Sequence, residues 1–145
     1  MAAADPRAKV PLRPMNSELA RRAAEAAQAK AGEFGHTISI AVVDESGNLV
    51  FFSRGDTCSF ITFETAKGKA AMAAGFRRPT RDYVPNARED AAFWTGVGER
   101  LRMIVGPGGY PITREGVLVG GIGCGGALGE EDHLCAEAGA KAASS

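Results

Sequence analysis

One of the two histidines in this sequence lies where an acid–base group would be useful. His133 directly follows Asp132, at the start of a segment with helical spacing. A carboxylate beside an imidazole fixes the tautomer of the ring and raises its basicity, which suits a base acting near neutral pH. The positive end of the helix dipole is expected to keep the pKa of Asp132 low. We predict that Asp132 and His133 move protons, whereas His36, at a strand edge, is expected to face solvent.

Two basic side chains near glycine-rich loops indicate a carboxylate site. Arg54 opens the tripeptide Arg54-Gly55-Asp56, and Lys69 lies on the helix expected next. An arginine contacts a carboxylate with two parallel hydrogen bonds, and a lysine adds a point charge. The alternative is an internal ion pair, in which Arg54 or Lys69 binds Asp56 or Asp132. The predicted catalytic residues are His133, Asp132 and Lys69, and Arg54 and Asp56 are predicted to bind substrate.

Two glycine segments complete this predicted site. Gly108-Gly109-Tyr110-Pro111 forms a loop entering a strand, and Gly125-Gly126 follows a second strand. Backbone N–H groups in such loops are free to bind a carbonyl oxygen or a developing oxyanion. We therefore add Gly108, Gly109, Tyr110, Pro111, Gly125 and Gly126 to the predicted substrate-binding residues.

The other motifs favour neither a nucleotide nor a metal. Residues 121–126 fit G-x-G-x-x-G, but only 19 residues follow, too few for the strand and acidic residue that a dinucleotide fold requires. Cys124, His133 and Cys135 are candidate zinc ligands by type. On a helix, however, positions 133 and 135 point about 200° apart, so they do not share an ion. We predict no metal site and no required cofactor.

Length and charge limit the remaining classes. The chain has 145 residues, the size of one domain, and its 17 basic and 17 acidic side chains cancel. A neutral chain lacks the basic surface that nucleic acid or anionic lipid requires, and no apolar stretch is long enough for a membrane span. The 3 cysteines lack a disulfide spacing, which favours reduced thiols and a cytoplasmic location.

Apolar spacing and turn residues predict an α+β domain with an antiparallel sheet. Residues 1–16 contain three prolines and are expected to form an irregular arm before a single domain at 17–145. The glycines of the strand at 117–123 indicate close approach of another backbone. The expected elements are a helix over 19–31 capped by Asn16 or Ser17, strands at 37–43 and 49–53, a helix over 60–75 capped by Ser59, a short helix over 88–94 capped by Asn86, an undecided stretch at 99–105, strands at 110–113 and 117–123, and a helix over 130–143.

Six segments of the chain share a pattern with a known family: Ile40–Leu49, Arg54–Asp56, Ala66–Ala70, Gly108–Ile112, Val119–Ala127 and Glu131–His133. Together they resemble the GlcG/HbpS family, also called haem-degrading or haem-binding, which includes the C-terminal domain of PduO-type proteins. The resemblance covers about residues 17–143. It departs from the family pattern at Cys124-Gly125-Gly126, where a serine is usual, and at Asp132-His133, where an Asp-Glu pair is usual.

The resemblance implies a profilin-like fold with a five-stranded antiparallel sheet flanked by helices, and assembly as a homo-oligomer, commonly an octamer. Our leading interpretation is a cytoplasmic small-molecule enzyme. It would act by proton transfer or water addition on a carbonyl, imine or enol compound that carries a carboxylate. The alternative is a protein that binds haem or another tetrapyrrole, with His133 or His36 as axial ligand. A third interpretation is a structural oligomer whose glycine strand only mediates packing.

Overall fold

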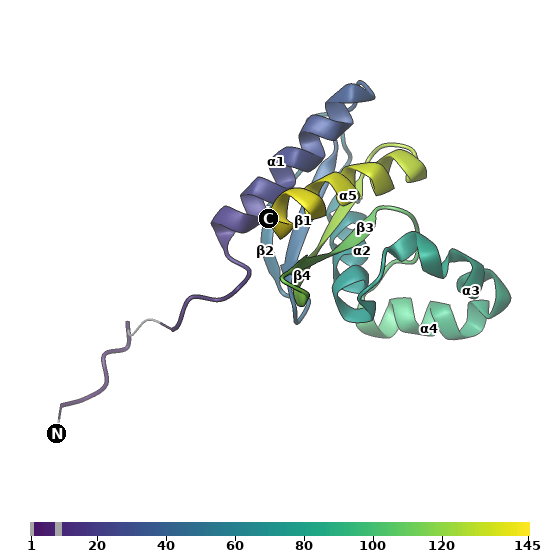
Figure 1. The fold of residues 1–145 in the computed structure, drawn as a ribbon. Helices are drawn as coiled ribbons and strands as arrows, with labels where there is room; N and C mark the ends of the chain where they lie inside the picture. Colours follow the sequence, from purple (N-terminus) through teal and green to yellow (C-terminus); the bar gives the residue numbers. More distant parts are fainter. Residues whose placement is uncertain (1, 8–9) are drawn as a thin grey trace.

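In the computed structural model, which describes residues 2–7 and 10–145, an antiparallel sheet separates two layers of helices (Figure 1). Helix α2 covers one face of the sheet, and α1 and α5 pack together across the other. The elements are α1 (Ser17–Glu33), β1 (Ser39–Asp44), β2 (Leu49–Ser53), α2 (Thr62–Phe76), a 3-10 turn (Thr80–Tyr83), α3 (Val84–Glu89), α4 (Ala91–Leu101), β3 (Gly109–Arg114), β4 (Val117–Gly125) and α5 (Gly129–Ser144).

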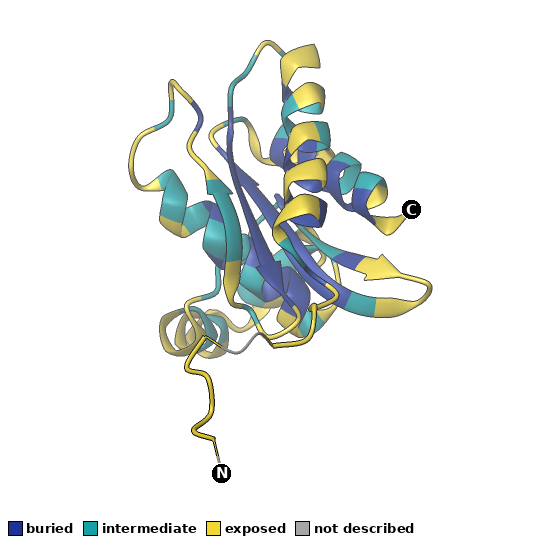
Figure 2. Ribbon diagram, turned by 90° about the vertical axis from the view of Figure 1, so that its left-hand side faces the viewer, coloured by how far each residue is buried: buried dark blue, intermediate teal, exposed yellow. Residues whose placement is uncertain are grey.

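The sheet confirms the α+β class and corrects the number of strands. Its order is β2-β1-β4-β3, and each neighbouring pair is antiparallel. The described residues form four strands, so the fifth strand implied by the family resemblance is wrong for this chain. The two central strands, β1 and β4, are almost entirely buried (Figure 2), which explains their apolar and glycine composition.

The glycines of β4 allow α2 to lie directly on the sheet, as the sequence predicted. A Cβ atom on Gly121 would meet the Ala70 carbonyl oxygen, and one on Gly123 would meet the Ala66 carbonyl oxygen. The facing side of α2 is also small, because Ala66 and Ala70 lie one turn apart and are fully buried. Neither layer has room for a further methyl group.

On the face of the sheet covered by α1 and α5, small residues again allow close packing. The buried face of α1 is mainly alanine, and Gly139 of α5 lies against Ala23 and Ala27 of that helix. Larger side chains from the sheet, such as Ile122, fill the space between the two helices. The small residues therefore set the distance between the layers, and the branched ones fill the core.

Several predicted helix ends differ in the structure. Asn16 does cap α1, because its side chain accepts a hydrogen bond from Leu19 N at 3.0 Å. Ser59 does not cap α2, which begins at Thr62. Asn86 lies within α3, and Asp90 caps α4 instead by accepting from Phe93 N at 3.2 Å. Residues 99–101 are helical and 102–105 carry no helix or strand, because Arg102 ends α4 in the left-handed conformation.

The start of the chain leads away from the domain (Figure 1). Residues 2–7 and 10–14 are exposed and form no helix or strand, and Met15 is the first buried residue of the core. Positions 1, 8 and 9 of the predicted arm lie outside the described residues. Among the described helices, none combines the length and the apolar character needed to cross a membrane.

Candidate functional site

The topology brings the predicted site residues to one end of the sheet. In an antiparallel sheet, the ends of β2 and β4 lie beside the starts of β1 and β3. The register shows this directly, since Ser39 pairs with Gly125 and Gly109 pairs with Gly123. The Arg54–Asp56 loop, the Gly106–Gly109 loop, Gly126 and the start of α5 therefore border the same end. We call it the loop end of the sheet.

An ion pair lies beneath the loop end. Lys69 Nζ is 3.7 Å from Asp132 Oδ2, with side chains 12% and 5% exposed. The same ammonium donates to the Cys124 carbonyl oxygen at 3.0 Å, and Asp132 Oδ1 accepts from Ala127 N at 3.1 Å. Of the alternatives that the sequence left open, the internal ion pair of Lys69 with Asp132 is the one that forms. Each charge is thus already neutralised within the chain.

Gly108 closes over this pair. Its φ is +125°, a conformation that side chains rarely adopt, and a Cβ there would lie 3.0 Å from Lys69 Nζ. The adjoining loop is fixed by Thr80, whose hydroxyl donates to the Gly106 carbonyl oxygen and accepts from Gly109 N at 2.9 Å. Thr80 was not among the predicted site residues. A single threonine in a turn carries no signal that separates such a role from an exposed position.

Burial changes the expected electrostatics of Asp132. Loss of solvent raises the pKa of this carboxyl, and Lys69 and the Ala127 N–H offset the rise only in part. The prediction that the helix dipole keeps this pKa low is therefore wrong. The dipole acts at an exposed helix terminus, whereas Asp132 lies under the glycine loop, where desolvation is the larger effect.

His133 is buried in the core. The residue is 1% exposed, and its ring lies beside the Tyr110 ring, with the two ring centroids 5.7 Å apart. Its Nδ1 atom has no hydrogen-bond partner among the described residues, so Asp132 does not fix its tautomer as the sequence analysis expected. Burial, followed by the positive charge of Arg81, lowers the pKa of the imidazole. The ring is thus enclosed, and its burial favours the neutral form.

This burial predicts a pH-dependent stability. Because the folded protein lowers the pKa of His133, the unfolded chain binds the proton more readily. The resulting stabilisation is present above the unfolded pKa of about 6.5 and is lost as the pH falls below it. His133→Gln is expected to cost about 1–3 kcal/mol, because it buries an amide without partners. Its urea unfolding free energy should then decline less than the parent's between pH 7 and pH 5. Equal declines would contradict this account.

His36 is the accessible imidazole at the loop end. Its side chain is 39% exposed, and its Nε2 lies 3.2 Å from Glu131 Oε1 in the first turn of α5. Gln28 fixes the backbone beside it, donating to the His36 carbonyl oxygen at 3.2 Å and accepting from Ile38 N at 3.3 Å. The ring is therefore partly exposed, as expected, but it is paired with Glu131 rather than facing solvent alone.

The predicted arginine lines a hollow whose wall begins one residue after this histidine. A hollow of about 310 Å³ is lined by Arg54, Asp56, Gln28 and Thr37, the residue that follows His36. Arg54 is exposed and forms no ion pair within the described part of the chain. Its loop is anchored by Ser39, whose hydroxyl accepts from Gly55 N at 3.1 Å and bonds Thr62 Oγ1 at 2.7 Å. The guanidinium is therefore available to an anionic ligand.

Gly126 packs closely against Cys58 and Ile38 at the loop end. A Cβ on Gly126 would lie 2.5 Å from Cys58 Sγ and 3.8 Å from Ile38 Cα. Gly125 is packed against Thr65 of α2.

Of the cysteines, Cys124 and Cys135 are buried in the core, where loss of solvent raises the pKa of Cys135 to about 11. Such thiols behave as small apolar side chains.

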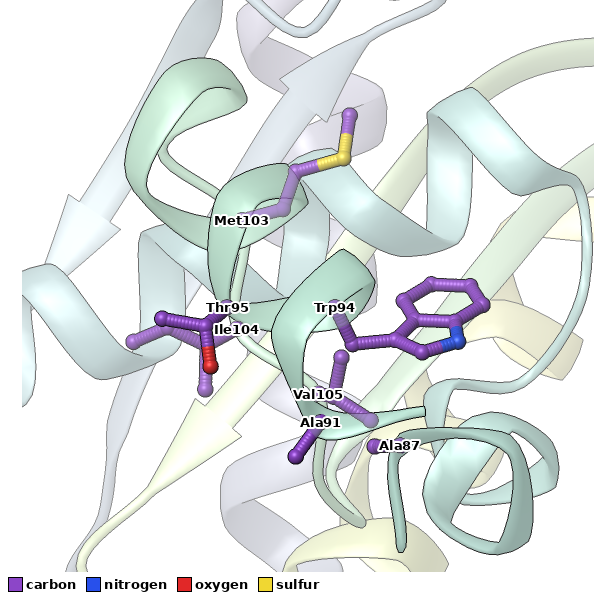
Figure 3. A pocket seen from close by; sticks show the side chains of 7 residues that line it. All are labelled: Ala87, Ala91, Trp94, Thr95, Met103, Ile104 and Val105. Atoms are coloured by element: carbon purple, nitrogen blue, oxygen red, sulfur yellow. The ribbon is translucent and has the colours of Figure 1, made fainter. Parts of the chain in front are cut away.

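A separate hollow between α4 and the segment after it contains no charged side chain. It measures about 310 Å³ and is walled by Trp94, Met103, Ile104 and Val105, with Ala87, Ala91 and Thr95 at its edge (Figure 3). Its apolar lining suits packing rather than proton transfer. The described residues also contain no cluster of three His, Cys, Asp or Glu side chains able to hold a metal ion.

Comparison with known proteins places this geometry in a family. Residues 15–141 match the family model described as haem degrading protein HbpS-like. Protein GlcG of Escherichia coli K12 is 33% identical over 112 residues, which cover 75% of this chain and 79% of GlcG. A double mutant of HbpS from Streptomyces reticuli is 31% identical, with a TM-score of 0.77 over 97% of this chain and 94% of that one.

A further structure shares the fold. The PduOC:heme complex superimposes with a TM-score of 0.78 over 88% of this chain and 94% of that chain, at 24% identity. The family model covers nearly all of the ordered domain, and GlcG and HbpS each exceed 30% identity over most of the chain. The chain therefore belongs to the HbpS-like family of haem degrading proteins.

Proposed function

We propose that this chain binds haem at the loop end of the sheet, with His36 as the axial ligand of the iron. The observation that carries the proposal is the pairing of an accessible imidazole with an adjacent hollow lined by Arg54. Haem iron takes an imidazole ligand, and the carboxylates of haem suit a free guanidinium. The family name and the name of the PduOC:heme complex support this ligand class. Bound haem would supply the redox and oxygen chemistry of its iron.

Different residues of the chain would bind the iron and the carboxylates of haem. His36 Nε2 would exchange its Glu131 partner for the iron, while the Gln28 hydrogen bonds keep the backbone around it in place. Arg54 would pair with a carboxylate of the porphyrin edge. His133 is 1% exposed within the core, so between the two axial ligands that the sequence allowed, the geometry favours His36.

Titration with haemin, followed by absorbance, tests the assignment. The parent is expected to shift the Soret band away from that of free haem. His36→Ala should change the position of the band and weaken binding at least about tenfold, since losing even a residue that orients a metal ligand commonly costs 10–100-fold. Arg54→Gln should weaken binding and leave the band unchanged, because it alters the carboxylate contact alone.

Lys141→Ala provides the matched control, since it removes an exposed basic side chain from the far end of α5. It should titrate like the parent. A parent spectrum indistinguishable from that of free haem would rule out haem binding by this chain. A parent-like spectrum in His36→Ala would rule out His36 as the axial ligand.

A second candidate function rests on the Lys69–Asp132 ion pair beside Gly108 and Gly109. The glycine N–H groups and the ion pair are the parts that an enzyme would use for proton transfer on a small carboxylate-bearing carbonyl compound. Such an enzyme would exchange the methyl protons of pyruvate for deuterium in D₂O, and Asp132→Asn would abolish the exchange. Proton NMR measures the rate. Parent exchange no faster than buffer, tested on pyruvate and 2-oxobutyrate, would contradict this function.

We further propose a homo-oligomer, with the octamer as its form, and a cytoplasmic location. The support for assembly is the resemblance to the family and the exposed, unstructured stretch at residues 10–14. The neutral charge balance argues against nucleic acid and membranes as partners, and a small molecule remains the expected ligand.

A further inference from the structure

Helix α4 presents an apolar outer face that no described part of the chain covers. None of its residues is buried, and Phe93 and Leu101 are 56% and 51% exposed. Figure 1 shows the helix at the margin of the molecule, beside α3 and apart from the sheet. Its inner side is already engaged, because the Trp94 ring lies 5.5 Å from the ring of Phe76 and 5.3 Å from that of Tyr83.

The outer face is shaped for another helix. Ala92, Gly96 and Arg100 follow one another at a spacing of four residues, so they form a single row, and Phe93 and Val97 lie in the next row. Hollows of about 420 and 410 Å³ lie along this face, and both are lined by Gly96 and Arg100. A Cβ on Gly96 would meet nothing within 4 Å. The row is therefore a groove with bulky side chains along its edge.

The charges of α4 indicate which partner would pack on its outer face. Its N-terminal end carries Asp90, and its C-terminal end carries Glu99, Arg100 and Arg102, a net positive charge. When a second α4 lies antiparallel across a two-fold axis near Gly96, each acidic end meets a basic end. The two helix dipoles also oppose one another favourably. A two-fold contact requires a surface that is complementary to itself, and this one has that property.

We infer that the outer face of α4 is a homotypic interface, in which α4 of a second copy of this chain packs antiparallel with Gly96 at the two-fold axis. Phe93 of each copy then fills a hollow beside Arg100 of the other, where a guanidinium can stack on the ring. This inference names the contacting surface and does not depend on haem binding.

Cysteine cross-linking tests the position of the axis. In a Cys58→Ala background, which removes the one cysteine that is not buried, Gly96→Cys should form a disulfide-linked dimer on oxidation. A residue at a close two-fold contact faces its own copy within disulfide reach. Gly32→Cys is the control, because Gly32 is exposed on α1 with open space around it. Absence of the Gly96→Cys dimer, or equal dimer from both variants, would overturn the inference.

Light scattering on the full chain gives an independent result. The parent is expected at twice 15.1 kDa or a larger multiple. Gly96→Arg adds a good helix former in open space and places two bulky like charges, one from each copy, against one another at the axis, so it should keep the parent's circular dichroism and fall to a smaller mass. A parent at the monomer mass, or Gly96→Arg at the parent's mass, contradicts the interface.

Discussion

Gly123→Ala is expected to prevent folding or to lower the free energy of unfolding by more than about 4 kcal/mol, a range reached by few single substitutions. A Cβ at this position would overlap the Ala66 carbonyl oxygen and lie 2.6 Å from Ala70 N. Both atoms belong to the backbone of α2, so no side-chain rotation relieves the clash. Relief requires α2 to move away from β4, which opens the tightest layer of the core.

Urea unfolding followed by circular dichroism measures this effect, with Gly32→Ala as the control. Gly32 lies in the last turn of α1, and an added Cβ there would meet nothing within 4 Å. Its replacement should be neutral or stabilise by up to about 1 kcal/mol, because alanine favours the helix over glycine. An unfolding midpoint for Gly123→Ala equal to the parent's would show that a Cβ at position 123 does not clash with the backbone of α2.

Lys69→Met has the second largest expected effect, a loss of about 3–5 kcal/mol at pH 7. Asp132 is 5% exposed, and without Lys69 its carboxylate remains buried with no opposing charge. The double variant Lys69→Met, Asp132→Leu removes both charges and should recover most of this loss. A chemical denaturation series of the single and double variants measures the coupling between the two residues.

The sign of the pH dependence separates this explanation from simple loss of packing. Burial already raises the pKa of Asp132, and removing Lys69 takes away the largest opposing influence. A carboxyl with a raised folded-state pKa stabilises the fold below its unfolded pKa, and this contribution is lost as the pH rises through the folded value. The deficit of Lys69→Met should therefore be smaller at pH 4 than at pH 7. A deficit that does not change with pH would indicate lost packing alone.

Local patterns predicted the strands and their pairing well. The alternation at 37–43 and the turn that follows it place β1 and β2 within a few residues. The glycines of β4 correctly predicted that another backbone approaches closely. Such predictions succeed because the residue pattern and the physical constraint are both local. The helix ends were less predictable: Ser59, a preferred capping residue, lies three residues before the first helical residue, Thr62.

The site could be predicted by residue type but not by environment. The sequence placed Asp132 in the first turn of a helix, which is correct, and predicted that Asp132 and His133 move protons, whereas the fold buries both. Burial reverses the expected direction of the Asp132 pKa and leaves His133 without a partner at Nδ1. Both results depend on the Gly106–Gly109 loop and β3, which are distant in the sequence from Asp132. No spacing rule carries that information.

The most direct test of haem ligation at the loop end is imidazole rescue of His36→Gly. Removing the side chain leaves space at a position that is 39% exposed, so free imidazole can reach the iron. If His36 is the axial ligand, the ferric haem complex of His36→Gly will lack the parent's Soret spectrum and recover it when imidazole is added. A His36→Gly complex that already has the parent's spectrum before imidazole is added would contradict the account.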